Sequence, residues 1–246
     1  MDLPITESLP GFLLILVPEA CSDEKLPGVV LVHGGGGTAY SEWVKIWNER
    51  GYAAIAVDLE GHVPVPKAGG PSEGRHWESH AWSGPVRVGF FDDITEPLEN
   101  QWMYHAVSSV MLAHSLLRSI EEVDNEKIGI TGISWGGIIT SLVSGVENRF
   151  AFAVPVYGCG YLYESKSVFG TYFANENKKI WDPSNFIHQA KIPLLWVNSD
   201  HDGHFSVDIT SKSYKMTKQN FLLLSQWLHH IMRASKARLT FFSAPL

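Results

Sequence analysis

Cysteine is scarce in this chain of 246 residues, with Cys21 and Cys159 far apart in the sequence. Two isolated cysteines provide neither a disulfide framework nor the spacing of a metal site. There is also no run of lysine or arginine, and the net charge is −7, which disfavours a nucleic-acid surface or a membrane patch. The apolar run at 11–17 is too short to span a bilayer. These absences predict a soluble, cytoplasmic protein with free thiols and no nucleic-acid or membrane partner.

Hydrophobic residues make up 45% of the chain, enough for a sizeable core. Apolar runs of strand length alternate with amphipathic stretches, which is typical of strand–helix–strand units and hence of a parallel sheet. We predict an α/β fold, with a mostly parallel sheet of about seven strands and helices on both faces. The strands are expected at 12–17, 27–32, 52–57, 126–131, 150–156, 192–198 and 221–225. Helices are expected at 41–50, 102–121, 137–144 and 207–217, with a last helix after them.

Two long stretches, 61–95 and 161–187, lack a helix or strand period but are rich in aromatic residues. A long irregular segment within a compact domain is usually either functional or disordered. The aromatic content favours an ordered wall, and Trp77 and Trp82 are candidates for its substrate-contacting surface. We expect one domain over 1–246, with these stretches as insertions.

His76 and His80 are four residues apart within the first irregular stretch. The zinc-peptidase pattern requires a glutamate directly after the first histidine, and Trp77 stands there instead. No metal site is expected from this pair.

The sequence Gly132-Ile133-Ser134-Trp135-Gly136 lies between an expected strand and an expected helix. A G-x-S-x-G pattern in that context is typical of a nucleophile elbow, in which a sharp turn projects the serine hydroxyl. Glycines on both sides let the neighbouring backbones approach. The alternative is a glycine-rich turn with an inert serine.

A serine hydroxyl becomes nucleophilic when a general base takes its proton, and a carboxylate orients that base. After a nucleophile elbow, the acid and then the histidine follow in chain order, each beyond the end of a strand. Asp202 and His230 occupy those places. The sequence therefore predicts a triad of Ser134, Asp202 and His230.

A run of four glycines follows the strand at 27–32. Glycine amides at a strand end can donate hydrogen bonds to an oxyanion, and we expect Gly35 and Gly36 to do so together with the amide of Trp135. A phosphate-binding role is excluded for these glycines because no Gly-Lys-Ser/Thr follows them.

The segments 31–39, 132–137 and 154–160 resemble the α/β-hydrolase superfamily, and within it the acetyl xylan esterase and dienelactone hydrolase-like branch. The resemblance covers about 27–230. It implies a serine hydrolase that cleaves small acyl esters, such as acetyl esters including those of carbohydrates, through an acyl-enzyme intermediate and without a cofactor. Tyr157, in the third segment, is expected to contact substrate. The sequence carries no signal for the oligomeric state.

Two departures from the family pattern leave alternatives open. The usual Asn-Gly-Thr-Asn-Asp reads Asn-Ser-Asp-His-Asp here, so Asp200 competes with Asp202 for the role of the acid. Around the base, the glycine and tryptophan that relatives carry are missing, and His229 competes with His230. The apolar Leu228, two residues before the base, favours His230.

Two other functions therefore remain open. The altered histidine region is consistent with a catalytically silent protein that binds a ligand or partner. A prolyl-oligopeptidase-like peptidase is the second, although such peptidases usually carry an N-terminal β-propeller for which 246 residues leave no room.

Overall fold

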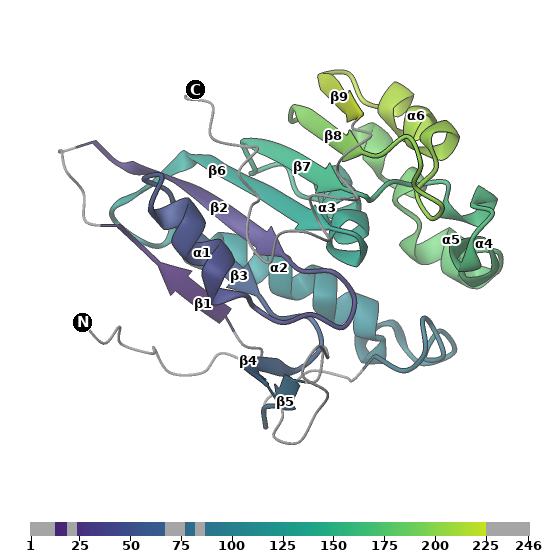
Figure 1. Ribbon diagram of the computed structural model, residues 1–246, viewed down its shortest axis with the longest axis horizontal. Coiled ribbons are helices and arrows are strands. Elements are labelled where there is room, and N and C mark those ends of the chain that lie inside the picture. Colours follow the sequence, from purple (N-terminus) through teal and green to yellow (C-terminus); the bar gives the residue numbers. More distant parts are fainter. Residues whose placement is uncertain (1–12, 19–23, 67–76, 82–86, 225–246) are drawn as a thin grey trace.

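The computed structural model describes residues 13–18, 24–66, 77–81 and 87–224 (Figure 1). Six residues singled out in the sequence lie outside these ranges: Cys21, His76, Trp82, Leu228, His229 and His230. The structural description of the site therefore rests on the other candidate residues.

A seven-stranded sheet forms the centre of the described chain, in the order β1-β3-β2-β6-β7-β8-β9. Only β1 runs antiparallel to its neighbour, so the predicted mostly parallel sheet is confirmed. Its strands are β1 (Leu13–Leu16), β2 (Leu26–Val32), β3 (Ala53–Val57), β6 (Val123–Ile133), β7 (Phe152–Val156), β8 (Leu194–Asn198) and β9 (Asn220–Leu224).

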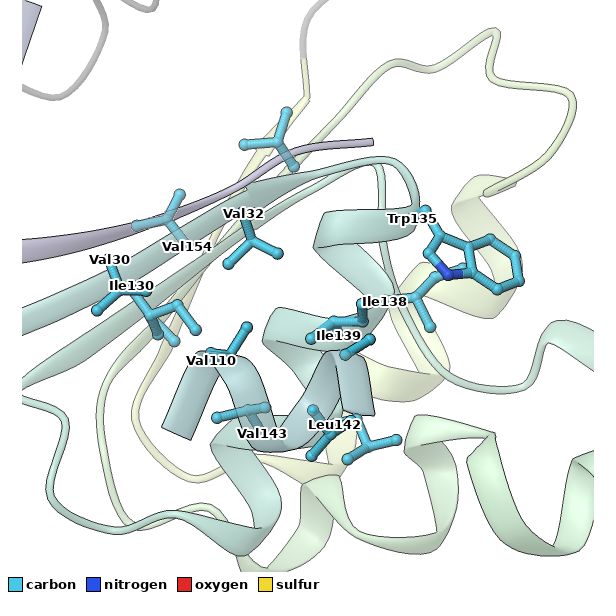
Figure 2. Close-up of a cluster of buried hydrophobic side chains, with 14 of the residues drawn as sticks. Val30, Val32, Val110, Ile130, Trp135, Ile138, Ile139, Leu142, Val143 and Val154 are labelled. Carbon is cyan, nitrogen blue, oxygen red and sulfur yellow. The ribbon is translucent and has the colours of Figure 1, made fainter. Parts of the chain in front are cut away.

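Helices cover both faces of the sheet (Figure 1). The described helices are α1 (Ser41–Asn48), α2 (Trp102–Arg118), α3 (Trp135–Val146), α4 (Val168–Tyr172), α5 (Glu176–Trp181) and α6 (Val207–Met216). Side chains of β2 alternate between the faces: Val29 and Leu31 pack with residues of α1, whereas Val30 and Val32 join the larger cluster with α2 and α3. Figure 2 shows the latter cluster, in which aliphatic side chains of the sheet meet those of α3. A strand buried on both faces accounts for the continuous apolar run at this position.

Several boundaries differ from the sequence prediction by a few residues, and the start of β6 is the informative case. The strand expected from residue 126 begins at Val123, and the turn signal around Asp124 falls within it. The register against β2 shifts there, and Asp124 Oδ1 accepts a hydrogen bond from Glu126 N at 3.0 Å. The turn around Asp124 is thus an irregularity within β6, and the strand begins before it.

The two irregular stretches contain short elements. The first includes an antiparallel pair that the sequence did not predict, β4 (His62–Pro66) and β5 (Trp77–Ser79), whose register is also shifted. The second contains the 3₁₀ turns η2 (Leu162–Glu164) and η3 (Pro183–Asn185) and also the short helices α4 and α5, which the sequence did not predict. The turn η1 (Leu98–Asn100) follows the first stretch, and η4 (Ile187–Gln189) begins at the last residue of the second. A three-residue strand paired irregularly leaves too little alternation in the sequence to be recognised.

Asp182 holds the second irregular stretch together. Its side chain is fully buried and accepts backbone hydrogen bonds from Tyr161, Leu162 and Ser184 at 2.8–3.0 Å. Burial raises the pKa of this carboxyl, and the three amides partly offset that effect. The Asp182 side chain therefore links the start of the segment after β7 to its end.

The start of α3 lies directly against the end of β2. A Cβ added to Gly136 would lie 2.3 Å from the carbonyl oxygen of Val32, a distance that real Cβ atoms do not adopt. Only glycine allows this approach of helix and strand.

His114 lies on α2 in a fully buried position. Its ring stacks on Phe150 with centroids 3.9 Å apart, and neither ring nitrogen has a hydrogen-bond partner among the described residues. Burial, assisted by the positive charge of Arg149, lowers the pKa of His114 to about 4. The histidine is therefore neutral in the folded protein near pH 7.

Replacing Gly136 by alanine should destabilise the protein by about 1–3 kcal/mol, the usual range for overpacking a close contact. Gly203→Ala is the matched control, because a Cβ there meets no atom within 4 Å. Urea midpoints measure both changes. Equal stability of the two variants would contradict the close approach of α3 to β2.

His114 should make stability depend on pH. Its pKa is about 4 in the folded state and about 6.5 when unfolded, so the unfolded chain binds more protons between these values. The free energy of unfolding should fall as the pH drops from 6.5 to 4, and level off below that for this group. His114→Gln should show less of this loss in urea titrations across that range, while His105→Gln, on the same helix, should retain it.

Candidate active site

Ser134 occupies the bend between β6 and α3, and its backbone has φ 56° and ψ −117°. A non-glycine residue with such a positive φ is strained. Ser134 is half-buried, whereas Trp135 beside it is buried. Its hydroxyl has no hydrogen-bond partner among the described residues. The G-x-S-x-G pattern therefore forms a sharp strand–turn–helix bend, as the sequence predicted.

The glycine run that follows β2 passes next to this bend. Its residues form a turn closed by a hydrogen bond from Gly37 N to Gly34 O at 3.1 Å. A Cβ added to Gly34 would lie 3.3 Å from the Ser134 Cβ, and one added to Gly35 would lie 4.0 Å from the Trp135 Cβ. The turn and the bend are thus in van der Waals contact.

The three amides expected to form an oxyanion hole differ in their surroundings. Trp135 is the first residue of α3. The N–H groups in the first turn of a helix have no carbonyl acceptor within that helix. The Gly36 amide, in contrast, donates to Glu60 Oε1 at 2.7 Å. In this conformation the Gly36 amide is therefore committed to a carboxylate, while Gly35 lies beside Trp135, within 4.0 Å of its Cβ for a Cβ added to the glycine.

The carboxyl ends of β6, β7 and β8 are joined in sequence by backbone hydrogen bonds. Ser134 N donates to Val156 O at 2.8 Å, and Tyr157 N donates to Val197 O at 2.9 Å. Tyr157 is buried and has a positive φ of 49°. The residues that follow these strands are consequently held at one edge of the sheet.

Asp202 lies in the loop after β8. Its Oδ1 accepts hydrogen bonds from the amides of His204 and Phe205, both at 2.8 Å. Burial, and next the negative charge of Asp202, raise the pKa of the Tyr157 hydroxyl. The Asp202 carboxylate is therefore close enough to Tyr157 to be felt electrostatically.

Asp200, the competing acid, contacts a histidine side chain. Its Oδ1 lies 2.7 Å from Nδ1 of His201, whose side chain is 82% exposed. This carboxylate thus has a partner at the protein surface.

Of the two tryptophans proposed to contact substrate, the structure describes Trp77. Trp77 lies on β5, donates from its indole N–H to Gly36 O at 3.2 Å, and meets Tyr40 edge-on. Trp77 therefore contacts the glycine turn itself. Trp82, like His229 and His230, lies outside the described ranges.

An aromatic cluster around Trp135 is a feature that the sequence reasoning did not identify. The Trp135 ring stacks with Phe169 and meets Phe90 edge-on, and Phe90 stacks on Tyr172 at 3.8 Å. Phe90 comes from the first irregular stretch, and Phe169 and Tyr172 from the second. The available signal was the aromatic content of both stretches, which indicates a wall but not which members meet.

Neither a metal cluster nor a membrane-crossing helix occurs in the part of the chain that the structure describes. No three His, Cys, Asp or Glu side chains there gather as metal ligands would, and no described helix is long and apolar enough to cross a membrane.

Comparison with known proteins found a curated relative and solved structures of similar fold. The uncharacterized peptidase YuxL of Bacillus subtilis (strain 168) is 21% identical over 223 residues, which cover 80% of this chain and 30% of that protein. This chain therefore spans less than a third of that curated relative's length.

Solved structures with the same fold include esterases and peptidases. An acetyl xylan esterase from Paenibacillus sp. R4 superposes with a TM-score of 0.66 at 17% identity, covering 90% of this chain and 77% of the esterase. The Pyrococcus horikoshii acylaminoacyl peptidase gives 0.62 at 22% identity, covering 86% and 34%. At these identities the likeness shows the α/β-hydrolase fold alone.

The family is shown by a longer match. The family model described as acetyl xylan esterase (AXE1) matches residues 14–170, which include the glycine turn, the Ser134 bend and Tyr157. This stretch is more than half of the chain, and the protein therefore belongs to the acetyl xylan esterase family of α/β-hydrolases.

Proposed function

We propose that this protein is a serine hydrolase that cleaves carboxylic esters through an acyl-enzyme intermediate, with Ser134 as the nucleophile. The observation that carries the proposal is the strained, half-buried Ser134 at the β6–α3 bend, in contact with the glycine turn. Strain of this kind persists where the surrounding structure enforces it, and it is concentrated at functional sites. Membership of the acetyl xylan esterase family supports a hydrolase.

The negative charge that forms on the carbonyl oxygen during acyl transfer needs hydrogen-bond donors close to Ser134. When the Ser134 oxygen attacks an ester carbonyl, the carbonyl oxygen becomes an oxyanion. The Trp135 amide lies at the N-terminus of α3, where the helix dipole also favours negative charge. We assign the oxyanion hole to the Trp135 amide and to the glycine turn, with Gly35 as the donor of that turn.

Asp202 is the proposed acid of the triad, and His230 the proposed base, with His229 as its alternative. Two amides fix the Asp202 side chain through Oδ1, and its Oδ2 has no donor among the described residues. A carboxylate anchored on one oxygen can orient an imidazole with the other. Asp200 is the weaker candidate because its carboxylate faces the exposed His201.

We propose small acyl esters, such as acetyl esters including those of carbohydrates, as the substrate class. The family relationship supports this class, and the Phe90–Tyr172 stack beside Trp135 supports an aromatic wall near the reacting group. Trp77, Trp82 and Tyr157 remain the other proposed substrate-contacting residues.

Ser134→Ala should abolish hydrolysis of p-nitrophenyl acetate, because loss of a triad nucleophile typically lowers turnover on the order of a million-fold. The thermal midpoint should stay close to that of the wild type, since alanine keeps the backbone strain. A fluorophosphonate probe, followed by mass mapping, should label Ser134. The control Ser115→Ala removes a hydroxyl on α2 that donates to Met111 O, and should retain activity.

The same assay separates the esterase from the peptidase. If an N-acetyl amino-acid p-nitroanilide is cleaved with a higher kcat/KM than the corresponding ester, the ester assignment is wrong and the peptidase takes its place. Retained activity in Ser134→Ala would remove the nucleophile assignment, and a wild type neither active nor labelled would favour a silent binding protein.

Asp202→Asn should lower kcat by up to roughly ten-thousand-fold, as happens when the carboxylate of a serine-protease triad becomes an amide and the imidazole adopts the wrong tautomer. Asp200→Asn is the matched control and should change kcat far less. Steady-state kinetics on p-nitrophenyl acetate measure both. An exchange of the two results would assign the acid to Asp200.

A further inference from the structure

The backbone N–H and the backbone carbonyl of Gly36 are each hydrogen-bonded to a side chain. Its N–H donates to Glu60 Oε1 at 2.7 Å, and its carbonyl accepts from Trp77 Nε1 at 3.2 Å. Both side chains come from the segment that follows β3, so they lie 24 and 41 residues away in the sequence. The glycine turn is thus fastened from outside rather than by its own residues alone.

The geometry of the turn explains why the contact to the Gly36 amide matters. The turn from Gly34 to Gly37 is closed by a hydrogen bond, and of its two central residues only Gly36 has a positive φ, at 70°. This is the pattern of a type II turn. Type I and type II turns differ chiefly by a flip of the central peptide, which reverses the Gly36 N–H. The acceptor of that N–H therefore selects the turn type.

Glu60 is itself firmly anchored. Its carboxylate receives Arg87 Nε at 3.2 Å and Arg87 Nη2 at 3.4 Å, and its side chain is 9% exposed. Its backbone N–H donates to the buried Asp58 at 3.3 Å. Breaking this partly buried pair would leave one of its charges without its partner. Glu60 is therefore built as a fixed anchor, not as a gate that substrate displaces.

Arg87 completes this anchor. It also donates to Gly89 O at 2.8 Å, and its guanidinium lies over the rings of Phe90 and Trp102 at 5.6 and 5.7 Å. The positive charge offsets that of Glu60, so the carboxylate can stand beside an oxyanion site without strongly repelling the developing charge.

We propose that Glu60 is a positioning residue that holds the Gly35–Gly36 peptide in its type II orientation, so that the Gly36 amide anchors the turn while Trp135 and the rest of the turn bind the oxyanion. This inference rests on the proposed ester hydrolysis at Ser134. It makes the Glu60–Arg87 pair part of the preorganisation of the site, at one remove from the reacting atoms.

Three substitutions of Glu60 separate its acceptor from its charge. Glu60→Gln keeps an acceptor at the same reach and should stay within about fivefold of the wild-type kcat. Glu60→Asp keeps the charge but withdraws the acceptor, and Glu60→Ala removes both. These two should lower kcat about 10- to 100-fold, the scale of a misplaced catalytic group, with KM within about threefold.

The turn itself can be observed without substrate. In ¹⁵N-labelled protein, hydrogen exchange of the Gly36 amide should accelerate at least tenfold in Glu60→Asp and Glu60→Ala, and stay near the wild-type rate in Glu60→Gln. Glu78→Ala, an exposed acidic position on β5, is the control and should change neither exchange nor kcat.

The outcomes are distinct. Unchanged Gly36 exchange in Glu60→Asp and Glu60→Ala overturns the anchor, whatever the activity. A higher kcat in Glu60→Ala would mean that Glu60 blocks the site. A slow Glu60→Gln variant beside a Glu60→Asp variant with wild-type kcat would mean that the charge alone matters. Either result overturns the positioning role. A wild type without turnover and without probe labelling at Ser134 instead removes the esterase proposal, and the exchange data still decide whether Glu60 holds the turn.

Discussion

The contact between the start of α3 and the end of β2 sets the geometry on which the rest of the site depends. Position 136 has no room for a side chain because the carbonyl oxygen of Val32 lies where a Cβ would be. The chain must therefore leave β6 and enter α3 in one sharp bend, and Ser134 is the residue at that bend. Because the turn after β2 lies against the same bend, a single packing contact brings the proposed nucleophile and oxyanion turn together.

The fold was largely predictable because its strongest signals are local. A strand buried on both faces, such as β2, has to be apolar at every position, and the pattern is visible without knowledge of its neighbours. The start of β6 and the β4–β5 pair were missed for the opposite reason. In both, the pairing is irregular, so the residues that define it follow no simple period.

The candidate site was predictable only in part. The bend at Ser134 is encoded within five residues, and the sequence suffices to identify it. The contact between Gly36 and Glu60 joins segments 24 residues apart, and the stack of Phe90 on Tyr172 joins two irregular stretches. No spacing rule connects such pairs, because the path of the chain between them decides whether they meet. The choices between Asp200 and Asp202, and between His229 and His230, remain predictions.

The backbone conformation of Ser134 has a consequence for how this protein can evolve. Glycine adopts a positive φ readily, whereas a serine held there stores strain on the order of 1–3 kcal/mol. A mutation to glycine would release that strain and remove the hydroxyl in the same step. Selection for stability and selection for a reactive serine therefore favour different residues at position 134. A descendant that no longer needed the hydroxyl could become more stable by losing it.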